Sequence, residues 1–258
     1  MNEIYCGSIA GPFLTRPISN FRCSPNSIVP KKTSGFRLIT HLSFPPNFSV
    51  NDYVDEKFTP VKYSSFDNAI NMIKNLGVNA LIGKKDIKSA FRLLPIYPCD
   101  FDFLGFKLGP YFCIDKCLHM GYSESFSLFE QISTFVQWVI MKESESKNID
   151  HYLDEFFLLG ESNTLDCQNL MNNFDTVCSS LGVPVAQEKT EGPTTNLHYF
   201  GFLIDTGKML INIPDEIFLE LKSKIKFFWE KKGDVKGFTI SVWFISILFQ
   251  SVTSGQSC

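Results

Sequence analysis

The chain of 258 residues has eight cysteines but no CxxC pair, and it contains no internal repeat and no low-complexity segment. Zinc sites usually show tighter, paired ligand spacing, so the irregular group of Cys113, Cys117 and His119 is a weak metal candidate. Buried free thiols in a reducing compartment are the preferred interpretation. With 44% hydrophobic residues and 26 Phe, the chain can bury a sizeable core and does not have a disordered composition.

Sequence signals for secretion or a membrane span are missing as well. Residues 1–12 hold an acid at Glu3 and no basic start, so no secretory signal peptide is expected. The most apolar stretch, 238–252, is about fifteen residues long and carries Ser and Thr, whereas a spanning helix needs roughly twenty. We interpret it as a core helix that has lost its partners, or as a damaged end, in preference to a membrane segment. We therefore expect an intracellular protein, in the cytoplasm or nucleus, that is not secreted and has no membrane partner.

The chain also has little excess charge. The net charge of −3 by itself argues against a nucleic-acid-binding protein. The distribution is uneven, since residues 1–100 hold 12 Lys and Arg against 7 Asp and Glu, whereas residues 101–200 hold 5 against 14. Basic ends around an acidic middle would suit a metal site flanked by elements that contact a nucleic-acid backbone. Ordinary charge scatter on a solvated surface gives the same pattern, and charge alone does not separate the two.

What the sequence does contain is a carboxylate inside each of two apolar runs. Asp86 lies in the run 80–87, and Asp154 and Glu155 lie in the run 151–160. Acids are depleted in strands and avoid burial unless they are paired, hydrogen-bonded or metal-bound. Two such acids, brought side by side on an exposed lip, would form an oxygen-rich site for Mg²⁺ and for two-metal phosphoryl transfer. Alone, Asp86 could instead cap a turn at Ser89.

The hydrophobic pattern predicts a mixed chain of helices and strands. Apolar residues recur at helical spacing in four segments, at 66–76, 123–141, 165–181 and 214–232. Strands or hairpins are expected at 29–39, 80–87, 103–114, 152–160, 183–186 and 199–204. Residues 1–20 show no clear period and are expected to form a mobile arm. Together these elements predict an α+β sheet domain with helices mainly on one face.

Eight short motifs follow one another along residues 20–235. They are Phe21-Arg22-Cys23-Ser24-Pro25, Val29-Pro30-Lys31-Lys32, Phe36-Arg37-Leu38-Ile39-Thr40-His41-Leu42-Ser43, Asp86-Ile87-Lys88-Ser89-Ala90-Phe91-Arg92, Leu118-His119-Met120-Gly121, Tyr152-Leu153-Asp154-Glu155, Gly182-Val183-Pro184-Val185-Ala186-Gln187-Glu188-Lys189-Thr190-Glu191-Gly192-Pro193 and Tyr199-Phe200-Gly201-Phe202. In this order they resemble the reverse transcriptase domain of a retroelement, most closely the tyrosine-recombinase retrotransposons of the DIRS type. A single YxD motif is weak, but this many motifs in the right order is a specific signal.

The resemblance implies the right-hand polymerase fold of that family, an α+β fold with fingers, palm and thumb. It places a mobile arm over 1–20, fingers over 21–85, the palm with some finger insertions over 86–205 and a partial thumb over 206–258. It implies an RNA-directed DNA polymerase that uses dNTPs, a primer and an RNA or DNA template. The implied cofactor is a pair of Mg²⁺ ions, with Mn²⁺ as an alternative.

Matched residue by residue, the resemblance also implies the site. Asp86, Asp154 and Glu155 would be the catalytic carboxylates and, with the Ile87 carbonyl, the metal ligands. The residues that would contact the incoming nucleotide are Lys31, Lys32, Arg37, Phe91, Met120, Gly121 and Lys189. Phe200 and Gly201 would hold the primer end. Ordinary roles compete with these assignments, namely a surface ion pair for Arg37, core packing for Phe91 and a solvated loop position for Lys189.

The chain departs from the family pattern at several positions. Glu155 stands where the family has a second Asp, and its extra methylene moves the carboxylate by about 1 Å, which can cost about a hundredfold in rate. His119 stands where the family has Pro, Tyr122 and Glu124 replace small residues, and the thumb is short. A second hypothesis is therefore a truncated, partly decayed copy that is catalytically impaired, at most a passive nucleic-acid-binding module. A third, an unrelated acidic α+β binding protein, leaves the motif order unexplained.

Overall fold

The computed structural model describes residues 2–30 and 36–215, together with 217–220, 222, 223 and 226. Lys31, Lys32 and the predicted turn at 33–35 lie outside the described residues, as does the side chain of Arg37. The described positions between 215 and 226 are helical, and the remainder of the helix predicted for 214–232 lies outside the described part of the chain.

A four-stranded antiparallel sheet in the order β10-β5-β9-β8 forms the centre of the molecule. Its strands are β5 (Leu81–Asp86), β8 (Ile149–Tyr152), β9 (Glu155–Gly160) and β10 (Glu191–Thr194). In the β5–β9 pair Leu81 lies opposite Gly160, and Asp86 lies opposite Glu155. The two acid-bearing runs of the sequence are therefore neighbours in the sheet.

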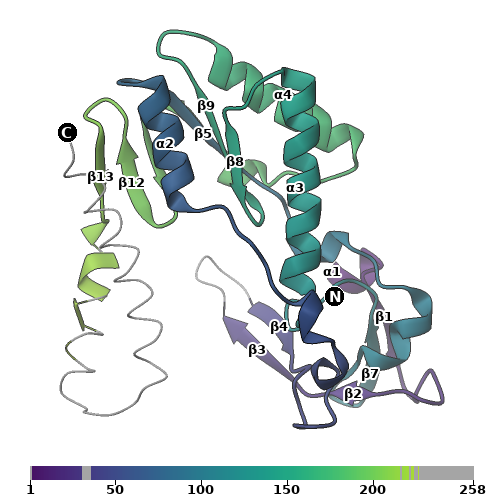
Figure 1. Ribbon diagram of the computed structural model, residues 1–258. Coiled ribbons are helices and arrows are strands. Elements are labelled where there is room, and N and C mark those ends of the chain that lie inside the picture. The colour runs from purple at the N-terminus through teal and green to yellow at the C-terminus, as the bar shows by residue number, and fades with distance from the viewer. Residues whose placement is uncertain (1, 31–35, 216, 221, 224–225, 227–258) are drawn as a thin grey trace.

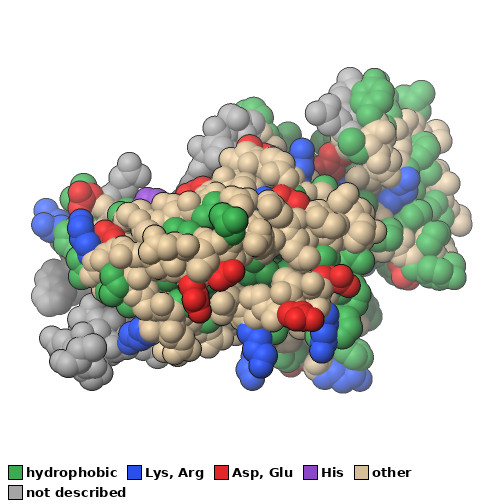
Figure 2. All heavy atoms as spheres, turned by 90° about the horizontal axis from the view of Figure 1, so that it is seen from above, with side chains coloured by type: hydrophobic (Ala, Val, Ile, Leu, Met, Phe, Trp, Pro, Cys, Tyr) green, Lys and Arg blue, Asp and Glu red, His purple; other side chains and the backbone are tan. Residues whose placement is uncertain are grey.

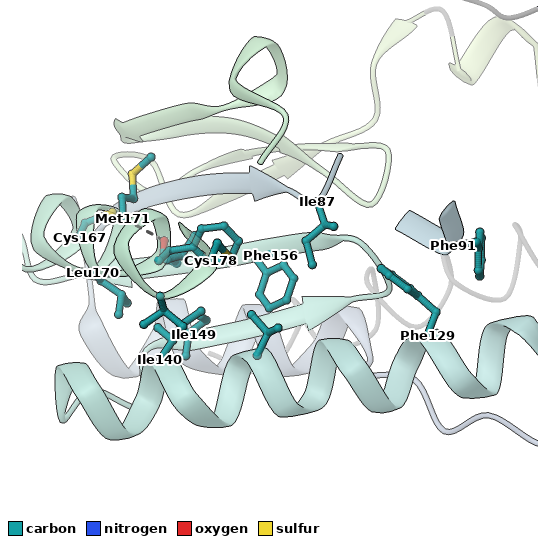
Figure 3. Close-up of a cluster of buried hydrophobic side chains, with 14 of the residues drawn as sticks. Ile87, Phe91, Phe129, Ile140, Ile149, Phe156, Cys167, Leu170, Met171 and Cys178 are labelled. Atoms are coloured by element: carbon teal, nitrogen blue, oxygen red, sulfur yellow. Dashed lines mark hydrogen bonds between the residues drawn. The ribbon is translucent and has the colours of Figure 1, made fainter. Parts of the chain in front are cut away.

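Two long helices, α3 (Ser125–Ser144) and α4 (Asp166–Ser180), cover one face of this central sheet (Figure 1). The strand residues on that face alternate with those on the other, and Phe156 and Leu158 of β9 pack there against the helices (Figure 3). Gly83 of β5 lies so close to α4 that an added Cβ would stand 2.5 Å from the Met171 sulfur. A larger residue at 83 would force the flexible Met171 side chain to move.

The other face of the central sheet carries α2 (Phe66–Leu76) and a three-stranded sheet in the order β11-β12-β13. These strands are β11 (Asn196–Tyr199), β12 (Phe202–Asp205) and β13 (Leu210–Asn212). Residues 66–76 form a helix as predicted, and Gly77, whose φ is +84°, ends it because its missing Cβ permits that conformation. The core on this face is built from Phe66, Ile73, Phe157 and Tyr199.

A second lobe contains a sheet in the order β1-β7-β6-β2 and the separate β3–β4 hairpin (Figure 1). Its elements are α1 (Asn2–Tyr5), β1 (Ile9–Phe13), β2 (Cys23–Ser24), β3 (Asn26–Pro30), β4 (Phe36–Thr40), β6 (Gly105–Leu108) and β7 (Tyr111–Asp115). The predicted pairings within 29–39 and 103–114 are confirmed. The lobe thus joins the N-terminal residues to a segment inserted between β5 and α3.

Short 3₁₀ turns connect these elements. They are η1 (Asn51–Tyr53), η2 (Glu56–Phe58), η3 (Ala90–Leu93), η4 (Pro98–Phe103) and η5 (Gln187–Lys189).

On the face seen from above, acidic and basic side chains are interspersed (Figure 2). Among the described residues, no helix has the length and apolar character needed to cross a membrane.

The structure differs from the sequence-based expectation at the N-terminus. Residues 1–20 were expected to lack regular structure, but β1 pairs with β7, with Ile9 opposite Asp115 and Ala10 opposite Ile114. The expectation of an unstructured arm is therefore wrong over this strand. Five residues paired with a partner about a hundred positions away leave no periodic signal in the local sequence.

Two predicted strands also differ. In the segment 183–186 only Val185 pairs, through a single bridge to Ile87. The predicted strand at 199–204 is two strands, because Phe200 and Gly201 have φ values of +53° and +80° and form the turn between β11 and β12. A Phe in the left-handed region is uncommon, so only Gly201 gave any sequence signal for that turn.

Candidate active site

Asp86 is the last residue of β5 and lies directly opposite Glu155, the first residue of β9. Main-chain hydrogen bonds fix both strand ends, since the Ile87 N–H donates to the Asp154 carbonyl at 2.8 Å and the Ala186 N–H donates to the Asp86 carbonyl at 2.8 Å. The predicted adjacency of the two acid-bearing runs is confirmed. The predicted exposed lip is wrong for Asp86, which is only 8% exposed because neighbouring segments cover the end of β5.

Asp154 lies in the tight turn that joins β8 to β9. The preceding residue, Leu153, has a φ of +53°, a left-handed conformation that costs a residue with a Cβ roughly 1–2 kcal/mol. The surrounding strand pairing, with Tyr152 opposite Glu155, holds this conformation. Such a turn places Asp154 beside the end of β5 instead of along a regular strand.

The ammonium group of Lys189, in η5, donates hydrogen bonds to both carboxylate oxygens of Asp86 at 2.9 Å. Burial alone would lower the pKa of Lys189. The hydrogen bond to Asp86 and the charges of Asp86, Asp154 and Glu155 outweigh it and raise the pKa above the usual lysine range. All three carboxylates therefore act on one positive charge.

The same carboxylates are the candidates for binding a divalent cation. Within the described residues, no three His, Cys, Asp or Glu side chains are arranged to hold a metal ion by themselves. The Asp86 carboxylate nevertheless holds a cation, the Lys189 ammonium, with both of its oxygens. Carboxylate oxygens are ligands of the kind that Mg²⁺ accepts, and Mg²⁺ usually takes its other ligands from water and phosphate.

Glu155 forms an ion pair with a different lysine, Lys84, whose ammonium lies 3.6 Å from the Glu155 carboxylate. Lys84 also forms an ion pair with Glu191 at 2.7 Å and donates to the His198 carbonyl at 3.1 Å. Burial raises the pKa of Glu155, the charges of Asp86 and Asp154 raise it further, and Lys84 opposes them. The positive charge of Lys84 thus partly offsets the repulsion of the Glu155 carboxylate by those of Asp86 and Asp154.

Phe91, in η3, is buried against α3 (Figure 3). Its ring centroid lies 5.2 Å from that of Phe126 and 5.3 Å from that of Phe129. The ring therefore serves in the hydrophobic core, which was the ordinary role weighed for it. Its contact with a nucleotide sugar stays a prediction.

Met120 and Gly121 line a pocket of about 730 Å³ together with residues of the 51–60 segment. An added Cβ at Gly121 would stand 2.8 Å from the Thr40 carbonyl, so only glycine allows this approach to the end of β4. Phe126 lines the same pocket and touches Phe91, which connects the pocket to the segment that follows Asp86.

The Phe200–Gly201 turn packs beside the acidic turn through aromatic rings. The Phe200 ring centroid lies 4.7 Å from that of Tyr152 and 4.7 Å from that of Tyr199. Tyr152 belongs to the Tyr152-Leu153-Asp154-Glu155 motif, so the predicted primer-binding turn contacts the motif that carries two of the carboxylates.

A buried ion-pair network that the sequence analysis did not identify supports the loops around the site. Arg92 binds both carboxylate oxygens of Asp115 at 2.6 and 2.7 Å, and His119 contacts the same carboxylate at 3.0 Å. Burial would raise the pKa of Asp115, but His119 and Arg92 lower it below the usual range. The network ties Arg92, next to Phe91, to His119, next to Met120. The sequence signal that could have indicated this network is Asp115 itself, an acid at the end of the apolar strand β7, just as Asp86 ends β5.

The structure thus brings together Asp86, Asp154, Glu155 and Lys189, and it places Tyr152 and Phe200 beside them. Met120, Gly121 and Phe91 are connected to this group through Phe126.

Neither a protein-family model nor a curated protein matches this chain. Several solved structures, in contrast, do match this chain. The foamy viral protease-reverse transcriptase dRH bound to double-stranded DNA matches with a TM-score of 0.65 and 15% identity, over 85% of this chain and 34% of that chain. The foamy viral protease-reverse transcriptase bound to an RNA/DNA hybrid matches with a TM-score of 0.60 and 18% identity, over 78% of this chain and 24% of that one.

This chain therefore spans well under half the length of the structures it matches. At such low identity the likeness concerns the fold. The chain has the α+β polymerase fold of reverse transcriptases, as its motif order predicted.

Proposed function

We propose that this chain is the polymerase domain of an RNA-directed DNA polymerase, which transfers nucleotides from dNTPs to the 3′ hydroxyl of a primer. The observation that carries the proposal is the pairing of Asp86 with the Asp154–Glu155 turn at adjacent strand ends of a reverse-transcriptase-like fold. Structures with this fold are complexes with double-stranded DNA and with an RNA/DNA hybrid, which supports a primer–template partner.

In this proposal Asp86 and Asp154 would hold a pair of Mg²⁺ ions, with the Ile87 carbonyl and Glu155 as further ligands. The ions, when bound, lower the pKa of the attacking hydroxyl and neutralise charge on the leaving pyrophosphate. The protein's own part is to hold the carboxylates in register, which the β5–β9 pairing and the Ile87–Asp154 hydrogen bond do. Met120 and Gly121 would bound the nucleotide, and Phe200 and Gly201 the primer end.

Lys189 has a separate role in the proposal. Its ammonium balances the Asp86 carboxylate before substrate binds. Since Lys189 is 56% exposed and lies on a short turn, it can leave Asp86 and contact the triphosphate as the cations bind. Lys31, Lys32 and Arg37 would contact the same triphosphate from the β3–β4 hairpin, where a guanidinium suits bidentate phosphate binding.

A second candidate is a catalytically impaired retroelement copy of the DIRS type that binds nucleic acid without turnover. The observation that favours it is the contact of Glu155 with Lys84, which gives the second carboxylate of the motif a lysine partner of its own. Either protein would act in the cytoplasm or the nucleus, where primer, template and dNTPs meet.

Primer extension separates these candidates. Wild type is expected to incorporate dNTPs weakly on RNA and DNA templates, and Asp86→Asn and Asp154→Asn are expected to abolish incorporation. Asp67→Asn, an exposed acid on α2, is the matched control and should behave as wild type. Extension by Asp86→Asn at the parental rate would overturn the site. Primer–template binding by wild type without any incorporation would instead favour the impaired copy.

A further inference from the structure

Asn51, in η1, uses every polar group that it has. Its main-chain N–H donates to the Leu42 carbonyl at 3.0 Å. Its side-chain amide donates to the Ser43 hydroxyl and to the Gly121 carbonyl, each at 2.8 Å, and its side-chain oxygen accepts from the Ser123 N–H at 3.0 Å. A single side chain therefore joins the segment that follows β4 to residues 121–123, about seventy positions further along the chain.

The turn that carries Asn51 is itself fixed by a reciprocal pair of hydrogen bonds. The Ser49 N–H donates to the Asp52 carboxylate at 2.8 Å, and the Asp52 N–H donates to the Ser49 hydroxyl at 3.2 Å. Ser49 is fully buried, whereas Asp52 is exposed, so water competes for this pair only from the Asp52 side. Asn51 thus projects from a rigid turn, which reduces the entropy lost in ordering its side chain.

On its other side, the segment held by Asn51 touches β4. Gly121 approaches the Thr40 carbonyl so closely that no side chain fits between them. Thr40 is the last residue of β4, the strand that also carries Arg37. The residues 120–123 therefore lie between the end of β4 and Asn51, and all of them line the pocket described above.

We propose that Asn51 is a positioning residue that holds the 120–123 segment against β4 and so sets the shape of the nucleotide pocket. It touches neither the carboxylates of Asp86 nor those of Asp154 in any hydrogen bond that the structure gives it. Its effect passes through Gly121 and Ser123. The assignment of the pocket to a nucleotide rests on the proposed function, whereas the Asn51 clamp itself, the four hydrogen bonds named above, does not.

The chemistry of the two amide ends allows a sharp test. Asn51→Ala removes both the donor to Gly121 and the acceptor for Ser123. Asn51→Asp keeps the acceptor but replaces the donor by a second oxygen, which repels the Gly121 carbonyl. Asn26→Ala is the matched control, because Asn26, opposite Thr40 in the β3–β4 pair, also donates through its side-chain amide to a main-chain carbonyl, but to that of Lys107 instead of one in the 120–123 segment.

Amide hydrogen exchange is the first readout and needs no enzymatic activity. The Ser123 amide should exchange at least tenfold faster in Asn51→Ala. The loss of one hydrogen bond of about 1 kcal/mol changes an opening equilibrium by roughly tenfold or less, and in this variant the 120–123 segment loses two such bonds. The Ser123 amide should stay protected in Asn26→Ala, and it should lose less protection in Asn51→Asp, which keeps the acceptor, than in Asn51→Ala. Unchanged exchange at residues 121–123 in Asn51→Ala would overturn the clamp.

The dNTP dependence of primer extension is the second readout. Both Asn51 variants should raise the KM for dNTP by about tenfold while kcat changes by about threefold or less, because the segment is loosened and the carboxylates are not. Equal losses in kcat and KM that also appear in Asn26→Ala would mean a general loss of structure and would overturn the positioning role. If wild type incorporates nothing, the proposed function fails, and the exchange readout alone decides the clamp.

Discussion

The Lys189 ammonium bridges both carboxylate oxygens of Asp86 at 2.9 Å, so the most buried acid of the site has a positively charged partner from η5. A lysine in this place satisfies Asp86 without metal. It also means that a divalent cation at Asp86 competes with a charge that belongs to the protein. The site is therefore expected to change its ion pairs when cations and a triphosphate arrive together.

Replacing Lys189 tests this competition. Lys189→Met should destabilise the metal-free protein by about 1 kcal/mol or less, since the lysine is more than half exposed. Added Mg²⁺ should then raise the melting temperature of this variant more than that of wild type, because the Asp86 carboxylate is free. Thermal unfolding with and without Mg²⁺ measures both effects. Lys208→Met, which removes an exposed lysine beside Asp205, serves as control, and an equal Mg²⁺ response in all three proteins would contradict the competition.

Shortening Glu155 tests whether its length limits catalysis. Glu155→Asp should raise incorporation with Mg²⁺, by up to about a hundredfold, because misplacement of a catalytic group by about 1 Å costs that much. In wild type Mn²⁺ should support more incorporation than Mg²⁺, which tolerates poor octahedral geometry badly. Steady-state primer extension in each metal measures this.

The matched control for that comparison is Glu191→Asp, which shortens the other glutamate paired with Lys84. It should leave incorporation unchanged. If wild type and Glu155→Asp have the same rate in both metals, the extra methylene is not the cause of weak activity.

Phe91 offers a test of core packing against sugar contact. Phe91→Ala should lower the free energy of unfolding by about 3–5 kcal/mol, because the ring is buried against Phe126 and Phe129. If the ring also contacts the sugar, the variant should incorporate ribonucleotides more readily relative to dNTPs. Phe129→Ala should lose similar stability without that change. An unchanged ribonucleotide preference in Phe91→Ala would leave Phe91 a core residue alone.

The Arg92–Asp115–His119 network predicts a pH dependence of stability. The folded-state pKa of Asp115 is lowered below its ordinary value of 3.8, so the ionised carboxylate stabilises the fold above that pH. This contribution is lost as the pH falls through the lower, folded-state pKa. Asp115→Asn should therefore cost about 3–5 kcal/mol near neutral pH, since it leaves Arg92 without its buried partner, and less at a pH below the folded-state pKa of Asp115.

Urea unfolding at neutral and acid pH measures this difference. Glu3→Gln is the control, because Glu3 contacts the same Arg92 from a half-exposed position and should cost about 1 kcal/mol or less. A constant gap between wild type and Asp115→Asn at all pH values would contradict the assigned titration.

The parts of the structure that the sequence predicted are those with a local signal. The helix at 66–76 was predicted because Ser65, an apolar stripe and Gly77 mark it within a dozen residues. The pairing of Asp86 with the Asp154–Glu155 turn was predicted because an acid in an apolar run is unusual at each position.

The parts that the sequence did not predict depend on distant partners. The structural role of Asp115 depends on its ion pairs with Arg92 and His119, and that of Asn51 depends on its hydrogen bond to Gly121. No local sequence pattern records those contacts. The turn at Phe200 depends on a backbone conformation that its residue type disfavours. Tertiary packing decided these features.

The central claim is that Asp86 and Asp154 jointly bind divalent cations at the paired ends of β5 and β9. Titration with Mn²⁺, followed by the electron paramagnetic resonance signal of free Mn²⁺, tests it directly in the presence of primer–template and a dNTP. Wild type and Asp67→Asn are expected to bind Mn²⁺ equally, and Asp86→Asn and Asp154→Asn should each lose most of that binding. Mn²⁺ binding by Asp86→Asn with the affinity and number of sites of wild type would contradict the account.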